Sequence, residues 1–208
     1  MKIIDISIQI FEGMPTYMNN QDNQPKIKTE THGYITDTTI QMNIHTGTHL
    51  DAPLHMIEEG ENIETIPLER LVRPCKVLDL TNVNDRITAA DLKDQPIMKD
   101  DFLLFKTKNS FDETSAMEFI FLAEDGAQFL IEKGIEGVGI DTLGIERSQT
   151  GHPTHKALFS NDVLIVEGLN LKEVSEGEYT MVCAPIKLLS TEAAPARVLL
   201  IEGTNLSF

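Results

Sequence analysis

The hydrophobic pattern along the chain predicts more strands than helices. Isoleucines at 4, 6, 8 and 10 alternate with polar residues, which is typical of a half-buried strand over 4–10. Further segments either alternate in the same way or are continuously apolar, as expected of buried strands. These segments are 26–31, 38–45, 76–80, 101–107, 137–141, 163–169, 179–189 and 196–202.

Helical spacing is confined to a few segments. Apolar residues recur with a helical period over 122–133, and Gly134 follows where a C-terminal cap is expected. Thr88 is a suitable cap for a short helix through Leu92, and a second short helix is expected over 153–159. Strands interspersed with helices predict an α/β or α+β fold, of which we favour α/β, with a mixed sheet in a single domain over residues 1–208.

The charge balance narrows the classes of partner. The chain has 17 basic and 33 acidic residues, a formal net charge of −16, which disfavours binding to nucleic acid and to anionic membranes. No apolar run approaches the ~20 residues of a membrane helix, and the early Asp5 argues against a signal peptide. Cys75 and Cys183 form no metal or redox motif, so we expect buried thiols in a cytoplasmic protein.

The segment I-H-T-G-T-H-L-D-A-P-L-H, residues 44–55, concentrates candidate metal ligands. His45 falls on the polar face of its predicted strand, and the glycine two residues later permits a bend. Beyond the bend, alternation predicts that His49, Asp51 and His55 project from one face, with Pro53 protecting the extended backbone. Imidazole and carboxylate groups together suit Zn²⁺, Mn²⁺ or Fe²⁺. The alternative, polar side chains on a solvated sheet face, accounts less well for four convergent groups.

A second group of candidate ligands lies later in the chain. Pro153 is suited to the first position of a helix, which places His155 in its first turn, with His152 just before. Glu167 lies in the apolar strand V-L-I-V-E-G-L, where a carboxylate needs a metal or another cation to neutralise it. A salt bridge to lysine or arginine is the alternative for Glu167.

The candidate ligands outnumber what one zinc ion with an open position requires. There are five of them, enough for two ions if a carboxylate bridges the pair. His55 is then left free beside the metal site, where an imidazole can serve as general base and acid. The five ligands are His45, His49, Asp51, His155 and Glu167.

The chain resembles the metal-dependent cyclase-like hydrolases that include bacterial kynurenine formamidase and isatin hydrolase. Their signature, H-x-G-T-H-x-D-x-P-x-H, is matched in full from His45 to His55. The resemblance extends over most of the chain. It includes D-I-S at 5–7, G-I-D-T-L at 139–143, the spacing of His155 and Glu167, and A-P-A-R at 194–197.

The resemblance implies a compact domain of the swivelling β/β/α type that forms a homodimer or homotetramer. It also implies a centre of two divalent ions, Zn²⁺ foremost and Mn²⁺ next. His45, His49 and Asp51 then look like ligands of the first ion, with Asp51 and Glu167 as bridges. His155 looks like a ligand of the second ion, and His55 like the catalytic acid and base.

The expected activity is hydrolysis of a carbon–nitrogen amide bond in a small molecule, of the kynurenine formamidase (arylformamidase) type, by a metal-bound hydroxide. In the loop over 12–25, Tyr17 stands where kynurenine formamidases share a tryptophan that packs against the substrate. The Pro-Gly-Asp sequence that those proteins share in this loop is missing here. We therefore expect Tyr17 to bind substrate. The alternatives are hydrolysis of isatin-type or other cyclic amides, and a catalytically silent metal-binding relative.

Overall fold

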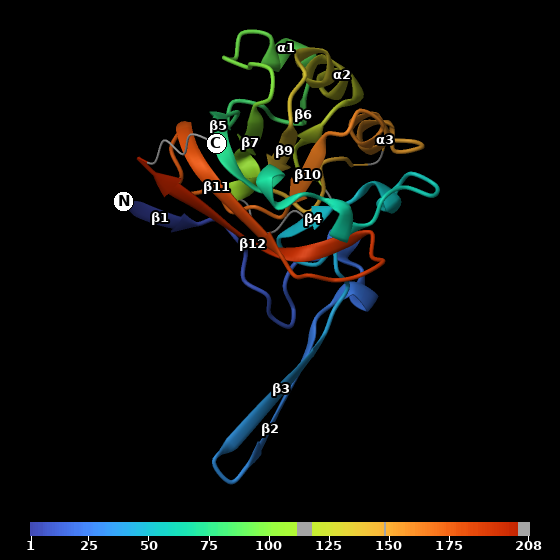
Figure 1. Ribbon diagram of the computed structural model, residues 1–208, viewed down its shortest axis with the longest axis vertical. Coiled ribbons are helices and arrows are strands. Elements are labelled where there is room, and N and C mark those ends of the chain that lie inside the picture. The colour runs from blue at the N-terminus through green and yellow to red at the C-terminus, as the bar shows by residue number, and fades with distance from the viewer. Residues whose placement is uncertain (112–117, 148, 204–208) are drawn as a thin grey trace.

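A large mixed sheet forms the body of the protein, as the computed structural model shows for residues 1–111, 118–147 and 149–203 (Figure 1). The strand order is β1-β12-β11-β5-β7-β9-β10-β4, and a further pairing of β4 with β12 closes the sheet into a barrel-like arrangement. Strands β5, β7, β9 and β10 run parallel, whereas the pairs that involve β1, β4, β11 and β12 are antiparallel. The predicted α/β class with a mixed sheet is confirmed.

The strands are mostly short, and their bounds follow the apolar segments of the sequence. They are β1 (Lys2–Asp5), β2 (Lys26–His32), β3 (Ile35–Gln41), β4 (His49–Asp51), β5 (Val72–Asp79), β6 (Arg86–Ile87), β7 (Phe102–Lys106), β8 (Phe121–Leu122), β9 (Gly137–Ile140), β10 (Leu164–Glu167), β11 (Gly177–Pro185) and β12 (Ala193–Glu202).

Three α-helices accompany the sheet in the described part of the chain. They are α1 (Ala89–Leu92), α2 (Glu124–Lys133) and α3 (Pro153–Ser160). Thr88 and Asp91 form a capping box at the start of α1, as the sequence predicts for Thr88. Gly134 ends α2 in the left-handed conformation, with φ of 71°, also as predicted. Helix α2 begins two residues later than predicted.

Two apolar cores lie on the opposite faces of the sheet, because alternate residues of its buried strands point in opposite directions. Leu103 and Phe105 of β7 belong to the core that includes Leu130 of α2. Phe102 and Leu104 of the same strand belong to the core enclosed by β5, β11 and β12. This double burial explains why the central strands are continuously apolar in sequence.

Two of the predicted strands, over 4–10 and 38–45, are shorter than the sequence predicts. Only residues 2–5 of the first strand are regular, and Ser7 makes an isolated bridge with Leu169. The strand predicted over 38–45 ends at Gln41. Together β2 and β3 form a separate hairpin that projects from the body (Figure 1).

The two cysteines and the helices add two smaller findings. Cys75 and Cys183 are both buried and free, and burial raises the pKa of each thiol to about 12, so both stay protonated. Of the helices in the described residues, none is long and apolar enough to cross a membrane.

Candidate metal centre and active site

The shortest strand of the large sheet carries the centre of the site. β4 lies between β10 and β12, and its register puts His49 directly opposite Glu167 on the neighbouring strand. His49, Asp51 and Glu167 are all buried, with exposed fractions of 1%, 0% and 4%. Their ligand atoms lie within 4.8 Å of one another. The sheet thus brings together donors that are more than a hundred residues apart in sequence.

A tight approach of two loops holds β4 against β10. Gly47 has φ of 83° and forms the bend that the sequence predicts. Gly168 has φ of 71°, and a Cβ atom there would lie 2.4 Å from the carbonyl oxygen of Gly47, so only glycine fits. Thr48 fixes the contact, because its hydroxyl donates to the Gly168 carbonyl and accepts from the amide of Ile8.

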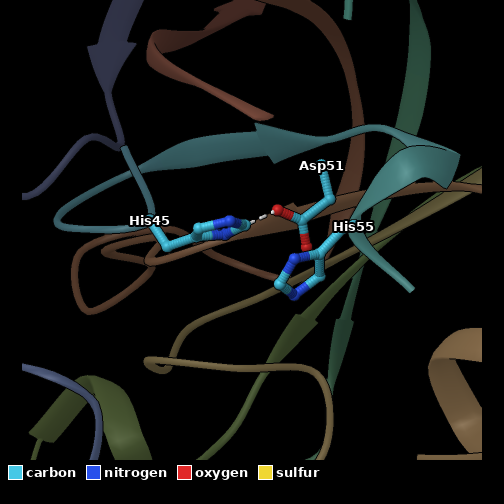
Figure 2. A group of neighbouring side chains, drawn as sticks. All are labelled: His45, Asp51 and His55. Carbon is cyan, nitrogen blue, oxygen red and sulfur yellow. Dashed lines mark ion pairs between the residues drawn. The ribbon is translucent and has the colours of Figure 1, made fainter. Parts of the chain in front are cut away.

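His45 and His55 reach Asp51 from irregular backbone on either side of β4 (Figure 2). The predictions that His45 ends a strand and that the chain stays extended to His55 are wrong. Pro53 instead starts a 3₁₀ turn, Pro53–His55, which turns the His55 ring toward that of His45, with ring centroids 4.2 Å apart. His45 Nδ1 lies 3.1 Å from Asp51 Oδ1. All the same, the side chains converge as the sequence predicts.

His155 completes the set from α3. It is 4% exposed, and its Nε2 lies 3.3 Å from Glu167 Oε1. Its Nδ1 lies 2.8 Å from Glu146 Oε2, and the same carboxylate oxygen accepts the backbone amide of His155. Pro153 starts α3 as predicted. Glu146 therefore fixes both the backbone and the ring of His155, with Nε2 directed at Glu167.

The donor atoms fit a cation. His49 Nδ1 lies 3.0 Å from the Gly47 carbonyl oxygen, which can only accept, so Nδ1 carries the proton and Nε2 is free to ligate. His49 Nε2 and both carboxylate oxygens of Asp51 are buried and make no hydrogen bond within the described residues. Buried polar atoms without partners are costly, and imidazole nitrogen with carboxylate oxygen is a donor set that divalent metals accept.

Without a cation the two buried histidines of the site, His49 and His155, hold protons, and the carboxylates beside them do not. Burial alone would lower the pKa of His49. The charge of Asp51 outweighs burial and raises this pKa well above its ordinary value. Burial alone would also lower the pKa of His155, but the hydrogen bond to Glu146 has the opposite effect and the pKa rises to about 10. Burial and Asp51 raise the pKa of Glu167, yet its histidine neighbours lower it to about 2. Metal binding must therefore displace protons from these imidazoles.

His55 differs from the other histidines of the site. Burial lowers its pKa, and the charges of His45 and His155 also lower it, against the opposite effect of Asp51. A neutral imidazole at neutral pH can accept a proton. The His55 ring also lies 5.8 Å from that of His155, so it is placed among the donors. His55, His45 and Asp51 offer ligand atoms within 4.8 Å of one another, so the geometry also accommodates His55 as a ligand.

A cavity of about 230 Å³ opens over the donor groups. His45, His55, His155 and Glu167 line it, and so does Tyr17, whose ring lies 6.1 Å from that of Phe119. The predicted substrate residue is therefore in the wall of the cavity that contains the donors. His152 also lines this cavity, with a half-exposed side chain and φ of 53°.

A larger cavity of about 490 Å³ adjoins the first and shares Pro15 and Leu143 with it. Its buried carboxylate, Asp141, accepts hydrogen bonds from the backbone and side chains of Thr107 and Ser110. Asp141 thus holds the loop after β7 in place. We assign the chemistry to the smaller cavity, because the candidate ligands His45, His155 and Glu167 line it together with His55.

Two carboxylates near the ligands were missed by sequence reasoning. Glu146 lies in an irregular segment, so no hydrophobic periodicity marks it in the sequence. Its role comes from its contact with His155, which only the folded structure shows. Glu192 comes just before β12, and its Oε1 lies 3.5 Å from His45 Nε2. Glu192 lies two positions before the A-P-A-R segment, and this proximity is the one signal for it in the sequence.

Comparisons with known proteins agree with this geometry. Residues 4–147 match the Cyclase family model, described as "Putative cyclase". A solved structure described as a predicted metal-dependent hydrolase from Bacillus stearothermophilus is 60% identical, with a TM-score of 0.89 over 96% of this chain and 97% of that one. Kynurenine formamidase from Erythrobacter litoralis is 32% identical over 77% of this chain and 74% of its own.

Isatin hydrolase A from Labrenzia aggregata shares the fold, with a TM-score of 0.83 over 97% of this chain and 94% of that one, at 23% identity. A buried set of histidines and carboxylates within a barrel-like mixed sheet, together with these relatives, defines a metal-dependent hydrolase. The chain belongs to the cyclase family.

Proposed function

We propose that the protein hydrolyses the formamide bond of a small N-formyl aromatic amine, releasing the amine and formate. It is a hydrolase that acts on a non-peptide amide bond. Two observations carry the proposal: His49 Nε2 and the Asp51 oxygens are buried and make no hydrogen bond within the described residues, and His55, His155 and Glu167 line a cavity. The likeness to kynurenine formamidases supports this substrate class.

Among the described residues, two groups of candidate ligands share Asp51, one with His45 and His55 and one with His49 and Glu167. We assign the binding of two divalent ions to five residues: His45, His49 and Asp51 would hold the first ion, and His155 and Glu167 would complete the site for the second. The two imidazoles that have an anchored Nδ1, His49 and His155, present Nε2 to the carboxylates. Zn²⁺ is the ion we favour and Mn²⁺ the next, since both accept imidazole and carboxylate. Such ions supply an acidified water and polarise a carbonyl oxygen.

His55 handles the protons in this scheme. Its neutral imidazole accepts a proton from the attacking water as the oxygen–carbon bond forms at the formyl carbon. The resulting imidazolium then donates that proton to the amide nitrogen as the carbon–nitrogen bond breaks. Protonation is required because an unprotonated amine anion is too basic to leave. The products are a neutral amine and formic acid, which releases its proton to the solvent and leaves as formate.

A substrate panel tests the proposal. Purified protein loaded with Zn²⁺ or Mn²⁺ is assayed with N-formyl anilines, isatin and simple lactams, and we expect turnover of the formanilides. Preference for isatin or lactams would instead support the cyclic-amide alternative, in which Tyr17 in place of tryptophan reshapes the cavity wall. Absence of turnover for every compound, in protein that binds metal, would support the silent relative.

The Glu146–His155 contact gives one prediction. Glu146→Ala removes the acceptor that orients His155, and outer carboxylates of this kind typically contribute about 10–100-fold to metal affinity. We expect titration calorimetry to show weakened binding of one ion while the other is retained. Glu146→Gln keeps an acceptor oxygen and should retain more of the affinity. Equal loss in both variants would mean that charge, rather than orientation, is what Glu146 supplies.

The position of Tyr17 gives another prediction. Tyr17→Ala removes an aromatic wall, and aromatic packing contributes about 0.5–1.5 kcal/mol beyond area burial, so KM should rise several-fold to about tenfold. Metal content should not change. Tyr17→Phe is the matched control: an unchanged KM indicates packing, and a raised one indicates a hydrogen bond from the hydroxyl. If Tyr17→Ala leaves KM unchanged for every active substrate, another segment forms the wall.

We further propose a cytoplasmic location, in line with the free cysteines. We also propose that the working form is a homodimer or homotetramer. Nucleic acid and membranes are not expected partners, because the net charge is −16.

A further inference from the structure

The proposed chemistry leaves the larger cavity without a role. Its volume is about 490 Å³, against about 230 Å³ for the cavity that the candidate ligands line. A cavity of about 150 Å³ can hold a benzene ring, so the smaller cavity has room for an aryl formamide and little more. Ligand sites usually measure about 300–1,000 Å³, a range that the smaller cavity reaches only together with the larger one.

The two cavities meet along a boundary that includes an aromatic pair. Pro15 and Leu143 line both cavities. Tyr17 lines the smaller cavity and Phe119 the larger one, and their rings lie 6.1 Å apart. Gly144 lies beside both rings, because a Cβ atom there would be 3.5 Å from Tyr17 Cε2 and 3.7 Å from Phe119 Cζ. A substrate ring that packs on Tyr17 is therefore next to the larger cavity, and a substituent on its far side can extend into it.

The wall of the larger cavity combines apolar side chains with neutral amides. Phe11 and Met14 contribute apolar surface. Gln9 also lines the cavity, and its carboxamide makes no hydrogen bond within the described residues. The side chain of Asn170 uses its Oδ1, which accepts a backbone amide. These groups suit a ligand that has apolar surface and uncharged hydrogen-bonding groups.

Carboxylates in the same wall disfavour an anionic ligand. Asp5 and Asp141 both line the larger cavity. Asp141 is buried and accepts hydrogen bonds from Thr107 and Ser110, which stabilise its ionised form. Like charges placed side by side are unfavourable, and the net charge of −16 adds to the repulsion. A carboxylate on the substrate would therefore be repelled from this wall.

The cationic side chains of the protein do not offset this repulsion. Within the described residues no lysine or arginine lines either cavity, and the residues outside the described ranges include neither type. Two arginines contact residues of the wall, but each is paired with a carboxylate. Arg147 lies over the ring of Phe119, and its Nη2 is 2.7 Å from Asp85 Oδ1. Arg197 pairs with Asp5.

We propose that the larger cavity binds the part of the substrate that lies beyond the formamide, and that this part is uncharged. The proposal rests on the proposed function and narrows its substrate class to aryl formamides with a neutral, hydrogen-bonding extension. The formamide lies at the candidate ligands, the aryl ring packs on Tyr17, and the extension passes Leu143 into the larger cavity. A formyl amine whose extension ends in a carboxylate is a poor substrate.

Three formanilides test the length and the charge of the extension in metal-loaded protein. Formanilide itself fills only the smaller cavity, 4-(4-formamidobenzyl)benzamide adds a neutral second ring, and 4-(4-formamidobenzyl)benzoate differs from it only in the terminal carboxylate. We expect kcat/KM for the benzamide to exceed that for formanilide about tenfold or more, from burial of the second ring. It should exceed that for the benzoate about tenfold, from repulsion between like charges. A benzoate preferred over the benzamide would overturn the proposal.

A matched pair of variants at Gln9 locates the extension. Gln9→Arg adds a cation to the wall of the larger cavity, and Gln9→Glu adds an anion of nearly the same size as the glutamine. The ratio of kcat/KM for the benzamide over the benzoate should fall a few-fold in Gln9→Arg and rise a few-fold in Gln9→Glu. This ratio compares two substrates of one preparation, so loss of folded protein does not alter it. The same ratio in wild type and both variants would overturn the proposal.

Binding of the product amines keeps the test independent of turnover. Calorimetry on metal-loaded protein compares aniline, 4-(4-aminobenzyl)benzamide and 4-(4-aminobenzyl)benzoate, in wild type and in the two Gln9 variants. Failure to hydrolyse any formanilide would overturn the proposed function, and tightest binding of the amino benzamide would still support the larger cavity as the site of an uncharged ligand. Turnover of formanilide with no gain for the extended benzamide would overturn the cavity's role alone, as would equal binding of the three amines.

Discussion

His55→Ala should retain its metal and lose about 10²–10⁴-fold in kcat, the usual contribution of general acid–base catalysis. The reason is geometric: His55 reaches the donor groups from a 3₁₀ turn and lines the cavity, whereas His49 and His155 have an anchored Nδ1 and direct Nε2 at carboxylates. Metal analysis and steady-state kinetics on the same preparation make the measurement. His49→Ala is the matched comparison and should lose metal, because its Nε2 lies between two carboxylates.

The pH profile provides a second measurement of the same role. Burial lowers the pKa of His55 from its ordinary value of 6.5. The charges of His45 and His155 lower it as well, against the opposite effect of Asp51. As a base it must be neutral, so activity should fall as pH drops through a value below 6.5 and level off above it. This acid limb should disappear in His55→Ala. Loss of an ion from His55→Ala, with both ions kept in His49→Ala, would reverse the two roles.

Much of this site could be predicted from the sequence, because its signals are local. The alternation over His49–Asp51 survives in β4, so both side chains point into one centre. Glu167 was predicted in a buried strand from its apolar neighbours, and it is paired with histidines rather than with lysine or arginine. Gly47 was predicted as a bend because few other residues adopt its backbone angles.

The errors have physical causes as well. Pro53 was expected to keep the chain extended, but proline also favours the first position of a helical turn, and here a 3₁₀ turn carries His55. The strands of the projecting hairpin, β2 and β3, were predicted within a few residues, yet nothing in their alternation reveals that the body leaves them uncovered. A period of two reports an extended backbone and not what packs on it. Glu146 has no periodic signal, because its role depends on a contact with α3.

Asp51→Asn should cause the largest combined loss, abolishing both metal binding and turnover. A neutral amide cannot bridge two cations as a carboxylate does, and both Asp51 oxygens lack hydrogen-bond partners in the described residues. An ion at about 100 times its dissociation constant stabilises a folded protein by about 2.7 kcal/mol, so chelation should lower the Tm of wild type. The Tm of Asp51→Asn should then respond neither to chelator nor to added Zn²⁺.

The comparison with chelated wild type separates metal loss from misfolding. Demetallated wild type should melt somewhat above Asp51→Asn, because its Asp51 keeps the buried ion pair with His49 that an asparagine lacks. Turnover should return to wild type when Zn²⁺ or Mn²⁺ is restored, and not to the variant. Full activity in exhaustively demetallated wild type would contradict the metal mechanism, because water would then be activated by His55 and the protein alone.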